Sequence, residues 1–235
     1  MSKKKETKIL LAEHIFELRH IASGTFLDVR GLIADYIKES GLFAHWKIDT
    51  NIIHFRDAAE NILKDGGFAG YKSAGYIVYN PDTYNYFIDK ATKFWSTLQK
   101  NDKYKIPNPI RFGTRTKVFI PSNLSFEQIN NRIYTTVFSD KMQKLINGSE
   151  TDLQFVIDLI DHNFNLKILG GPVHKNEAIN YLSFHSDHFK KTGLYLDIDC
   201  FKTSDLTHKC IPDLLREGVK VTWEKVENIA AGLGM

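Results

Sequence analysis

The segment from Arg111 to Lys117 carries a basic stripe centred on a glycine. Successive side chains of a strand point to opposite faces, so Arg111, Arg115 and Lys117 would share one face with Gly113. Because Gly113 has no side chain, a ligand or another backbone could approach between two guanidinium groups, which are suited to bidentate recognition of anions. The stripe therefore predicts a site for a phosphate or an acidic peptide.

A second set of charges falls on the polar faces of two other predicted strands. It comprises Glu13, Glu17, Arg19, Asp197 and Asp199. If all three strands join one sheet, these charges can meet the basic stripe as cross-strand pairs. Three interpretations stay open: a lattice of charge pairs, a ligand-binding cleft, or a catalytic pair of carboxylates that would need desolvation to raise one pKa. The candidates for binding an anion or a partner are Arg19, Arg111, Arg115 and Lys117.

The densest set of metal-ligand residue types lies shortly before the last predicted strand. It comprises His185, Asp187 and His188, with Asp197 and Asp199 following closely. Such nitrogen and oxygen donors could hold zinc or a harder divalent ion, although a polar loop rich in His and Asp is equally ordinary. The alternative function is accordingly a metal-dependent hydrolase or nuclease. No phosphate-binding loop, nucleophile elbow or His-Glu-x-x-His motif occurs, and no cofactor is predicted.

Hydrophobic periodicity predicts the elements that would position these residues. Strands are expected at 8–21, at 45–56 around the turn-like Asp49-Thr50-Asn51, and at 71–79, 110–120, 164–169 and 194–201. Helices are expected at 26–39, 83–100, 125–138, 152–161 and 212–233. The run Gly170-Gly171-Pro172 is typical of a turn.

This order of elements predicts an α+β fold, with a largely antiparallel sheet and helices on one side. A polar segment with two prolines, residues 100–109, separates two similar halves, each reading strand, helix, strand, strand, helix. We expect a disordered N-terminus at 1–7, a first half at 8–105 and a second half at 106–235, the two packed as one unit.

Composition narrows the classes of partner. Hydrophobic residues make up 43% of the chain and the net charge is +3, which is too small for the whole-surface field of a dedicated nucleic-acid binder. Nucleic acid therefore stays a candidate ligand only if it binds to a local cluster of basic residues. No apolar window is long enough for a membrane span, and the two cysteines fit a reducing cytoplasm.

Four short motifs together resemble a sporadically distributed prokaryotic family of uncharacterised proteins of similar length. They are Glu17-Leu18-Arg19, the run from Tyr84 to Phe94, Arg111-Phe112-Gly113-Thr114-Arg115 and Leu196-Asp197-Ile198-Asp199. The chain departs from the family pattern after Arg115, where Thr116 and Lys117 replace an aromatic residue and an Asn. The resemblance implies one α+β unit with two similar halves, and it carries over no activity or catalytic residue.

The favoured function is a non-enzymatic binding or regulatory protein that uses a charged sheet face. The sporadic occurrence of the resembling family suggests a setting among mobile or defence-related genes. Expected partners are a protein or an anionic ligand, and a homodimer is compatible with the sequence.

Overall fold

The computed structural model describes residues 10–57 and 64–235, so the predicted disordered segment 1–7 lies outside the described residues. The strands there are β1 (Leu11–His20), β2 (His45–Ile48), β3 (Ile52–Arg56), β4 (Asp65–Gly70), β5 (Ser73–Tyr79), β6 (Pro109–Pro121), β7 (Phe155–Asp161), β8 (Phe164–Val173) and β9 (Gly193–Lys202). The helices are α1 (Gly24–Glu39), α2 (Tyr84–Lys100), α3 (Phe126–Val137), α4 (Asp140–Ile146) and α5 (Ile211–Gly232). None of these helices is long and apolar enough to cross a membrane.

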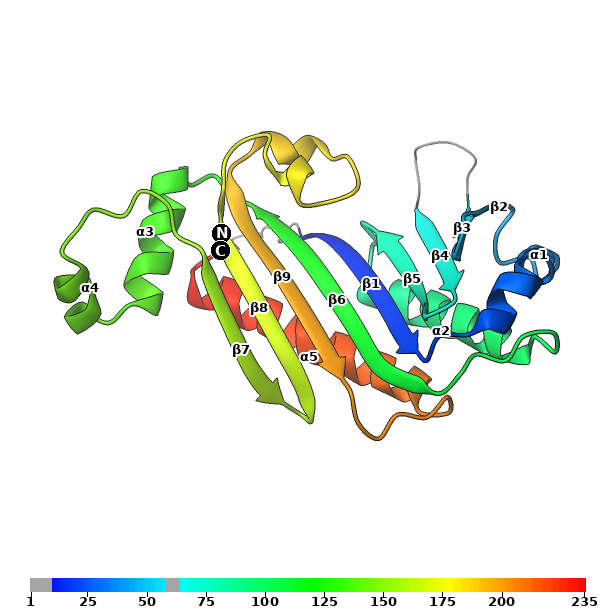
Figure 1. The fold of residues 1–235 in the computed structure, drawn as a ribbon. Helices are drawn as coiled ribbons and strands as arrows, with labels where there is room; N and C mark the ends of the chain where they lie inside the picture. Colours follow the sequence, from blue (N-terminus) through cyan, green and yellow to red (C-terminus); the bar gives the residue numbers. More distant parts are fainter. Residues whose placement is uncertain (1–9, 58–63) are drawn as a thin grey trace, which may run out of the picture.

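The nine strands form one antiparallel sheet in the order β2-β3-β4-β5-β1-β6-β9-β8-β7. The predicted α+β class with an antiparallel sheet is therefore confirmed. β1 and β6 lie side by side in the middle, and every other strand of each predicted half lies outward from them (Figure 1). The sheet thus runs without interruption from one half of the chain to the other.

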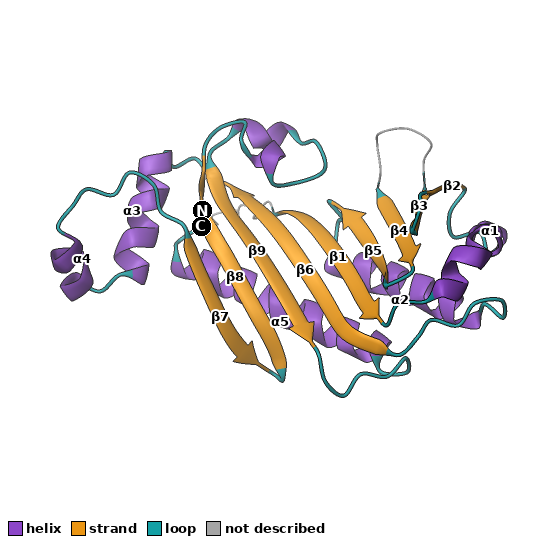
Figure 2. Ribbon diagram, viewed as in Figure 1, coloured by secondary structure: helices purple, strands orange, loops and turns teal. Residues whose placement is uncertain are grey.

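The long helices cover one face of this sheet, which we call the core face (Figure 2). α2 packs against β5, and α5 packs against β6, β9 and α2. The core side of β1 contributes Phe16 and Leu18, and the predicted apolar stripe of α2 contributes Phe87, Phe94 and Trp95. This buried cluster contains residues from both halves of the chain, so the two halves share one core.

On the opposite face, the open face, none of the described α-helices covers the central strands (Figure 2). Residues 174–192, which connect β8 to β9, fold over one end of it and contain two short 3-10 turns, Ala178–Asn180 and Asp187–Lys190. This excursion buries a separate apolar cluster on the open face, which includes Leu11, Phe119, Tyr195 and Phe189. The remainder of the open face, over β1, β6 and β9, carries charged side chains.

The helix predicted at 152–161 is wrong, because those residues contain the edge strand β7. Val156 and Ile160 are four residues apart and lie beside other apolar residues, which imitates helical spacing in so short a segment. The short helix α4 and the strand β4 were not predicted. β4 reads Asp65-Gly66-Gly67-Phe68-Ala69-Gly70, a glycine-rich sequence that has little strand propensity of its own.

The turn predicted at Gly170-Gly171-Pro172 is also wrong, because these residues continue β8. A Cβ on Gly170 would come within 2.4 Å of the Phe155 ring, so close side-chain packing, not chain reversal, requires this glycine. The pairing of β8 with β7 ends at the pair Phe155 and Gly170. Pro172 lies beyond that pair, so its lack of an N–H costs no hydrogen bond to β7.

The expected similarity of the halves holds only in outline. Among the described residues, the first half has four strands between its two helices. The second half has three strands and one additional helix between α3 and α5. Both halves begin with a central strand and end with a helix on the core face.

Candidate binding face of the sheet

The eight predicted charged residues meet in the middle of the open face. We call them the charged patch: Glu13, Glu17, Arg19, Arg111, Arg115, Lys117, Asp197 and Asp199. The sheet register places Lys117 between Glu13 of β1 and Asp197 of β9, and Arg115 opposite Asp199. Because strand side chains alternate, the neighbouring apolar residues turn to the core and leave these charges on the open face.

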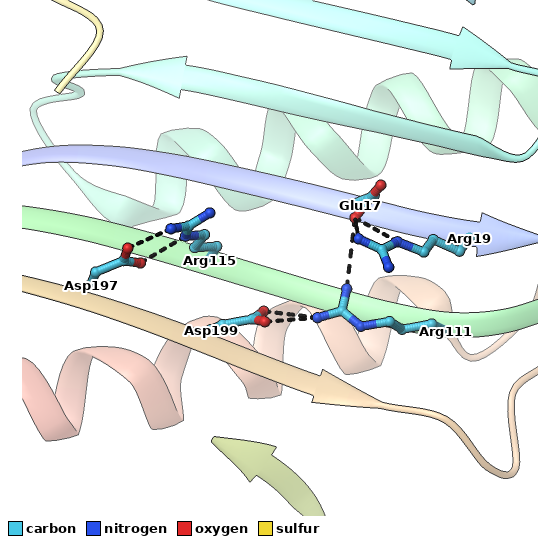
Figure 3. A network of polar contacts seen from close by, with 6 residues as sticks. All are labelled: Glu17, Arg19, Arg111, Arg115, Asp197 and Asp199. Carbon is cyan, nitrogen blue, oxygen red and sulfur yellow. Dashed lines mark hydrogen bonds and ion pairs between the residues drawn. The ribbon is translucent and has the colours of Figure 1, made fainter. Parts of the chain in front are cut away.

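Each arginine of β6 holds a carboxylate of β9 (Figure 3). Arg111 donates from Nη2 to both oxygens of Asp199, at 3.0 and 2.8 Å, and its Nη1 lies 3.7 Å from Glu17. Arg115 donates from Nε and Nη2 to the two oxygens of Asp197, at 2.7 and 2.5 Å. The two-nitrogen contact fixes the plane of the Arg115 guanidinium, and Arg111 is held between Asp199 and Glu17, so both arginines are positioned before any partner arrives.

The side chain of Arg111 fills part of the space over Gly113. A Cβ at Gly113 would lie 2.7 Å from Nη1 of Arg111, and the Arg111 guanidinium also lies over the Phe201 ring, 4.7 Å from its centroid. The glycine therefore admits the side chain of Arg111 between β1 and β9. Arg111, Gly113 and Arg115 also line a small hollow of about 130 Å³ on the open face, so the approach of a ligand between the two guanidinium groups stays a prediction.

The charged patch is electrically balanced, with four basic and four acidic side chains. Arg19 contacts Glu17, and Lys117 contacts Glu13, so all four cations touch a carboxylate. The hydrogen bonds and charge of Asp197 raise the pKa of Arg115, which keeps that guanidinium charged. A polyanion would have to compete with these carboxylates, whereas a surface carrying both signs of charge could pair with both.

Glu13 and Lys117 form the most buried pair of the patch. Glu13 is 2% exposed, and its Oε1 accepts from Lys117 Nζ at 2.9 Å. Its second oxygen accepts from the backbone N–H of Ser183 at 2.8 Å, which ties the 174–192 excursion to β1. This pair has a structural role in holding the excursion over the end of the sheet.

Replacing Lys117 with Met should destabilise the protein by about 3 kcal/mol, because it leaves the Glu13 carboxylate buried without its cation. Urea unfolding at pH 7 measures the change. Arg216→Ala removes an exposed α5 side chain and serves as the control, and its unfolding midpoint should stay within error of the wild type. A Lys117→Met midpoint equal to the control would contradict a buried, stabilising pair.

A cavity of about 310 Å³ adjoins the patch where the excursion meets the sheet. Arg115, Lys117 and Asp197 line one side, and Leu169 and Val173 provide apolar surface. Tyr181 of the excursion packs on Tyr195 with ring centroids 4.5 Å apart, and the Tyr195 hydroxyl lies 3.4 Å from Asp197. Tyr181 was missed from the sequence because it lies in an irregular segment without hydrophobic periodicity. The volume is at the lower end of the range for small-molecule sites.

The predicted metal ligands are not brought together. His185, Asp187 and His188 lie in the excursion, where Asp187 is exposed and accepts from Lys190 at 2.7 Å. Asp197 and Asp199 are instead held by arginines of β6. Across residues 10–57 and 64–235, no group of three His, Cys, Asp or Glu side chains is arranged to hold a metal ion.

Comparisons of the chain with protein-family models, with curated proteins and with solved structures each gave no match. The functional interpretation therefore rests on the residues of the charged patch and of the adjoining cavity.

Proposed function

We propose that this chain is a non-enzymatic binding protein that receives a protein partner on the open face of its sheet. The observation that carries the proposal is the charged patch. Its Glu13–Lys117 pair is buried beside the excursion, and its other three cations and three carboxylates are paired on the part of the sheet that no described α-helix covers. Cross-strand contacts order these side chains in advance, so a partner loses less side-chain entropy on binding them.

The balance of charge favours a protein over a nucleic acid as the partner. Nucleic-acid binding draws most of its affinity from cations that neutralise phosphates. The basic side chains of the patch instead already contact carboxylates, and Arg111 and Arg115 each donate to both oxygens of one aspartate. A protein surface with interspersed acidic and basic residues can add hydrogen bonds to both members of each pair without breaking it.

The cavity supplies an anchor point beside the charges. Leu169 and Val173 offer apolar contact and Tyr181 and Tyr195 offer aromatic surface, while Arg115 lies at the boundary with the patch. Interfaces typically concentrate their binding energy where one side chain fills such a pocket and a polar rim surrounds it. The partner is therefore expected to insert one apolar or aromatic side chain here and to set its polar residues over β1, β6 and β9.

The resemblance to a sporadically distributed prokaryotic family supports a regulatory setting among mobile or defence-related genes. The products of adjoining genes are then the first partners to test, with a toxin, nuclease or methylase favouring a regulatory role. Two cysteines without an expected disulfide agree with a cytoplasmic location.

The test uses the tagged full-length chain expressed in its native host, with co-purifying proteins quantified by mass spectrometry and the best candidate then titrated in purified form. Arg111→Ala with Arg115→Ala should weaken that complex at least tenfold. Tyr181→Ala should weaken it independently through the cavity. Arg216→Ala with Lys220→Ala removes two exposed basic residues of α5 and should leave affinity unchanged.

Thermal melting must show that each variant stays folded, so that lost affinity reports on the surface. If the double arginine variant keeps every interaction of the wild type, the proposed role of the charged patch is wrong. If a single-stranded or duplex oligonucleotide binds to the patch more tightly than any protein does, the partner class is wrong.

A further inference from the structure

The two edges of the nine-stranded sheet are built differently. β2 at one edge has four residues and carries Lys47, and both short length and an edge lysine discourage pairing with another chain. β7 at the other edge has seven residues and carries three exposed apolar side chains. They are Val156, Ile157 and Ile160, exposed by 54%, 43% and 77%. An edge strand that presents both backbone hydrogen-bonding groups and apolar side chains is a template for another strand.

The outer side of β7 has no neighbouring strand among the described residues (Figure 1). Val156 and Ile160 alternate with Asp158 on the open face, whereas Ile157 and Leu159 lie on the core side. An occupant must therefore be an extended segment that offers apolar side chains on both faces. β7 itself has this pattern, because apolar residues flank Asp158 at one and two positions in each direction.

We propose that β7 pairs antiparallel with β7 of a second copy of this chain, across a two-fold axis at Asp158. A two-fold axis perpendicular to the sheet keeps the faces in register, so a residue can pair only with one that shares its face. With the axis at Asp158, Val156 lies opposite Ile160 of the second copy on the open face. Ile157 lies opposite Leu159 on the core side, so every exposed apolar side chain of the edge meets another.

The same register brings two like charges together at the axis. Asp158 meets its own copy at the axis, but each of these aspartates is also the direct neighbour of Lys167 on β8. Across the joined sheets the row reads Lys167, Asp158, Asp158 and Lys167, so each acid has a cation beside it. Asp161 is already paired with Lys225 of α5 within its own copy and needs no partner across the interface.

This interface is separate from the proposed protein-binding face. The charged patch lies on β1, β6 and β9, and β8 stands between β9 and β7. Two copies joined through β7 would leave both patches uncovered, so loss of dimerisation and loss of partner binding are distinguishable.

Sedimentation velocity of the full chain over a concentration series tests the proposal. We expect a concentration-dependent dimer that Ile160→Lys weakens at least tenfold and that Asp158→Asn tightens by removing the repulsion at the axis. Leu32→Lys is the matched control, because Leu32 is 53% exposed and lies on α1, which contacts β2 and β3 near the other edge of the sheet. A wild type that stays monomeric throughout, or a dimer lost in Leu32→Lys and kept in Ile160→Lys, would overturn it.

Cysteine scanning tests the register. In a Cys210→Ser background, which removes the partly exposed native thiol, Ile157→Cys, Asp158→Cys and Leu159→Cys are oxidised mildly and separated on non-reducing gels. Only position 158 lies opposite itself, so it should form the covalent dimer fastest. Faster crosslinking at 157 or 159 would place the axis elsewhere and overturn the proposed pairing.

Discussion

Deletion of residues 212–235 should abolish cooperative folding, because it removes almost all of α5 from the core face. Leu215, Val219 and Val226 are fully buried there against the sheet. Burial of each such side chain contributes about 1.5–3 kcal/mol, so these three alone approach the 5–15 kcal/mol by which a native domain is stable. The deletion also exposes Phe112 and Leu196 on the core side of β6 and β9.

Far-ultraviolet circular dichroism during urea titration, together with a soluble-fraction assay, measures this outcome. The control is Lys220→Ala within α5, whose side chain is exposed and whose loss should leave the transition unchanged. A truncated chain that remained soluble and unfolded cooperatively would identify α5 as a dispensable arm, and partner binding would then have to be sought on that helix.

Acidification should reduce stability steeply through His14, a fully buried histidine of β1. Its ring stacks on Phe87, its Nδ1 lies 3.0 Å from the Thr116 hydroxyl, and burial lowers its pKa from 6.5 to about 3. Above pH 6.5 the imidazole is neutral in both the folded and the unfolded chain. Between pH 6.5 and 3 only the unfolded chain takes up this proton, so stability is lost as the pH falls through that window.

The whole window corresponds to about 5 kcal/mol, and the part between pH 6.5 and 4 to about 3 kcal/mol. His14→Leu removes this proton site, so the free energy of unfolding of the wild type relative to the variant should fall by about 3 kcal/mol from pH 7 to pH 4. Contributions from His20, His54 and His208, whose pKa values burial also lowers, are common to both proteins and cancel. Urea titrations at four pH values measure the difference.

The matched control is His45→Gln, which removes an exposed histidine at the sheet edge and should follow the wild-type pH dependence. Parallel curves for wild type and His14→Leu over this range would show that His14 does not titrate as a buried neutral group.

The long amphipathic elements were predictable because one face of each is buried. β1, β6, β9, α2 and α5 were all expected within a few residues of their observed bounds. The sequence pattern does not show why α5 contains Gly218: a Cβ there would lie 3.0 Å from the Thr114 hydroxyl on β6, so the glycine lets helix and strand approach closely. The edge strand β7 was not predicted, because it carries apolar residues on both of its faces and its sequence therefore lacks the alternation of apolar and polar residues that identifies a strand.

The members of the charged patch could be predicted from the sequence. Alternation along each strand places its charged residues on the face opposite its apolar residues, and this does not depend on which strands are neighbours. The course of the Arg111 side chain over Gly113 could not be predicted, because it depends on Phe201 and Asp199 of a strand that lies far away in sequence. The cavity depends on Tyr181 and the fold of the excursion, which no local pattern specifies.

The place of β1 in the middle of the sheet has a consequence for how the chain is made. β1 can pair with β5 once residue 79 has left the ribosome, but its other edge waits for β6 at residues 109–121. During that interval β1 is an edge strand carrying Glu13 and Glu17, and charged side chains discourage edges from joining other chains. Glu13 and Glu17, which later contact Lys117 and Arg111, would therefore first reduce aggregation of the nascent chain through this edge.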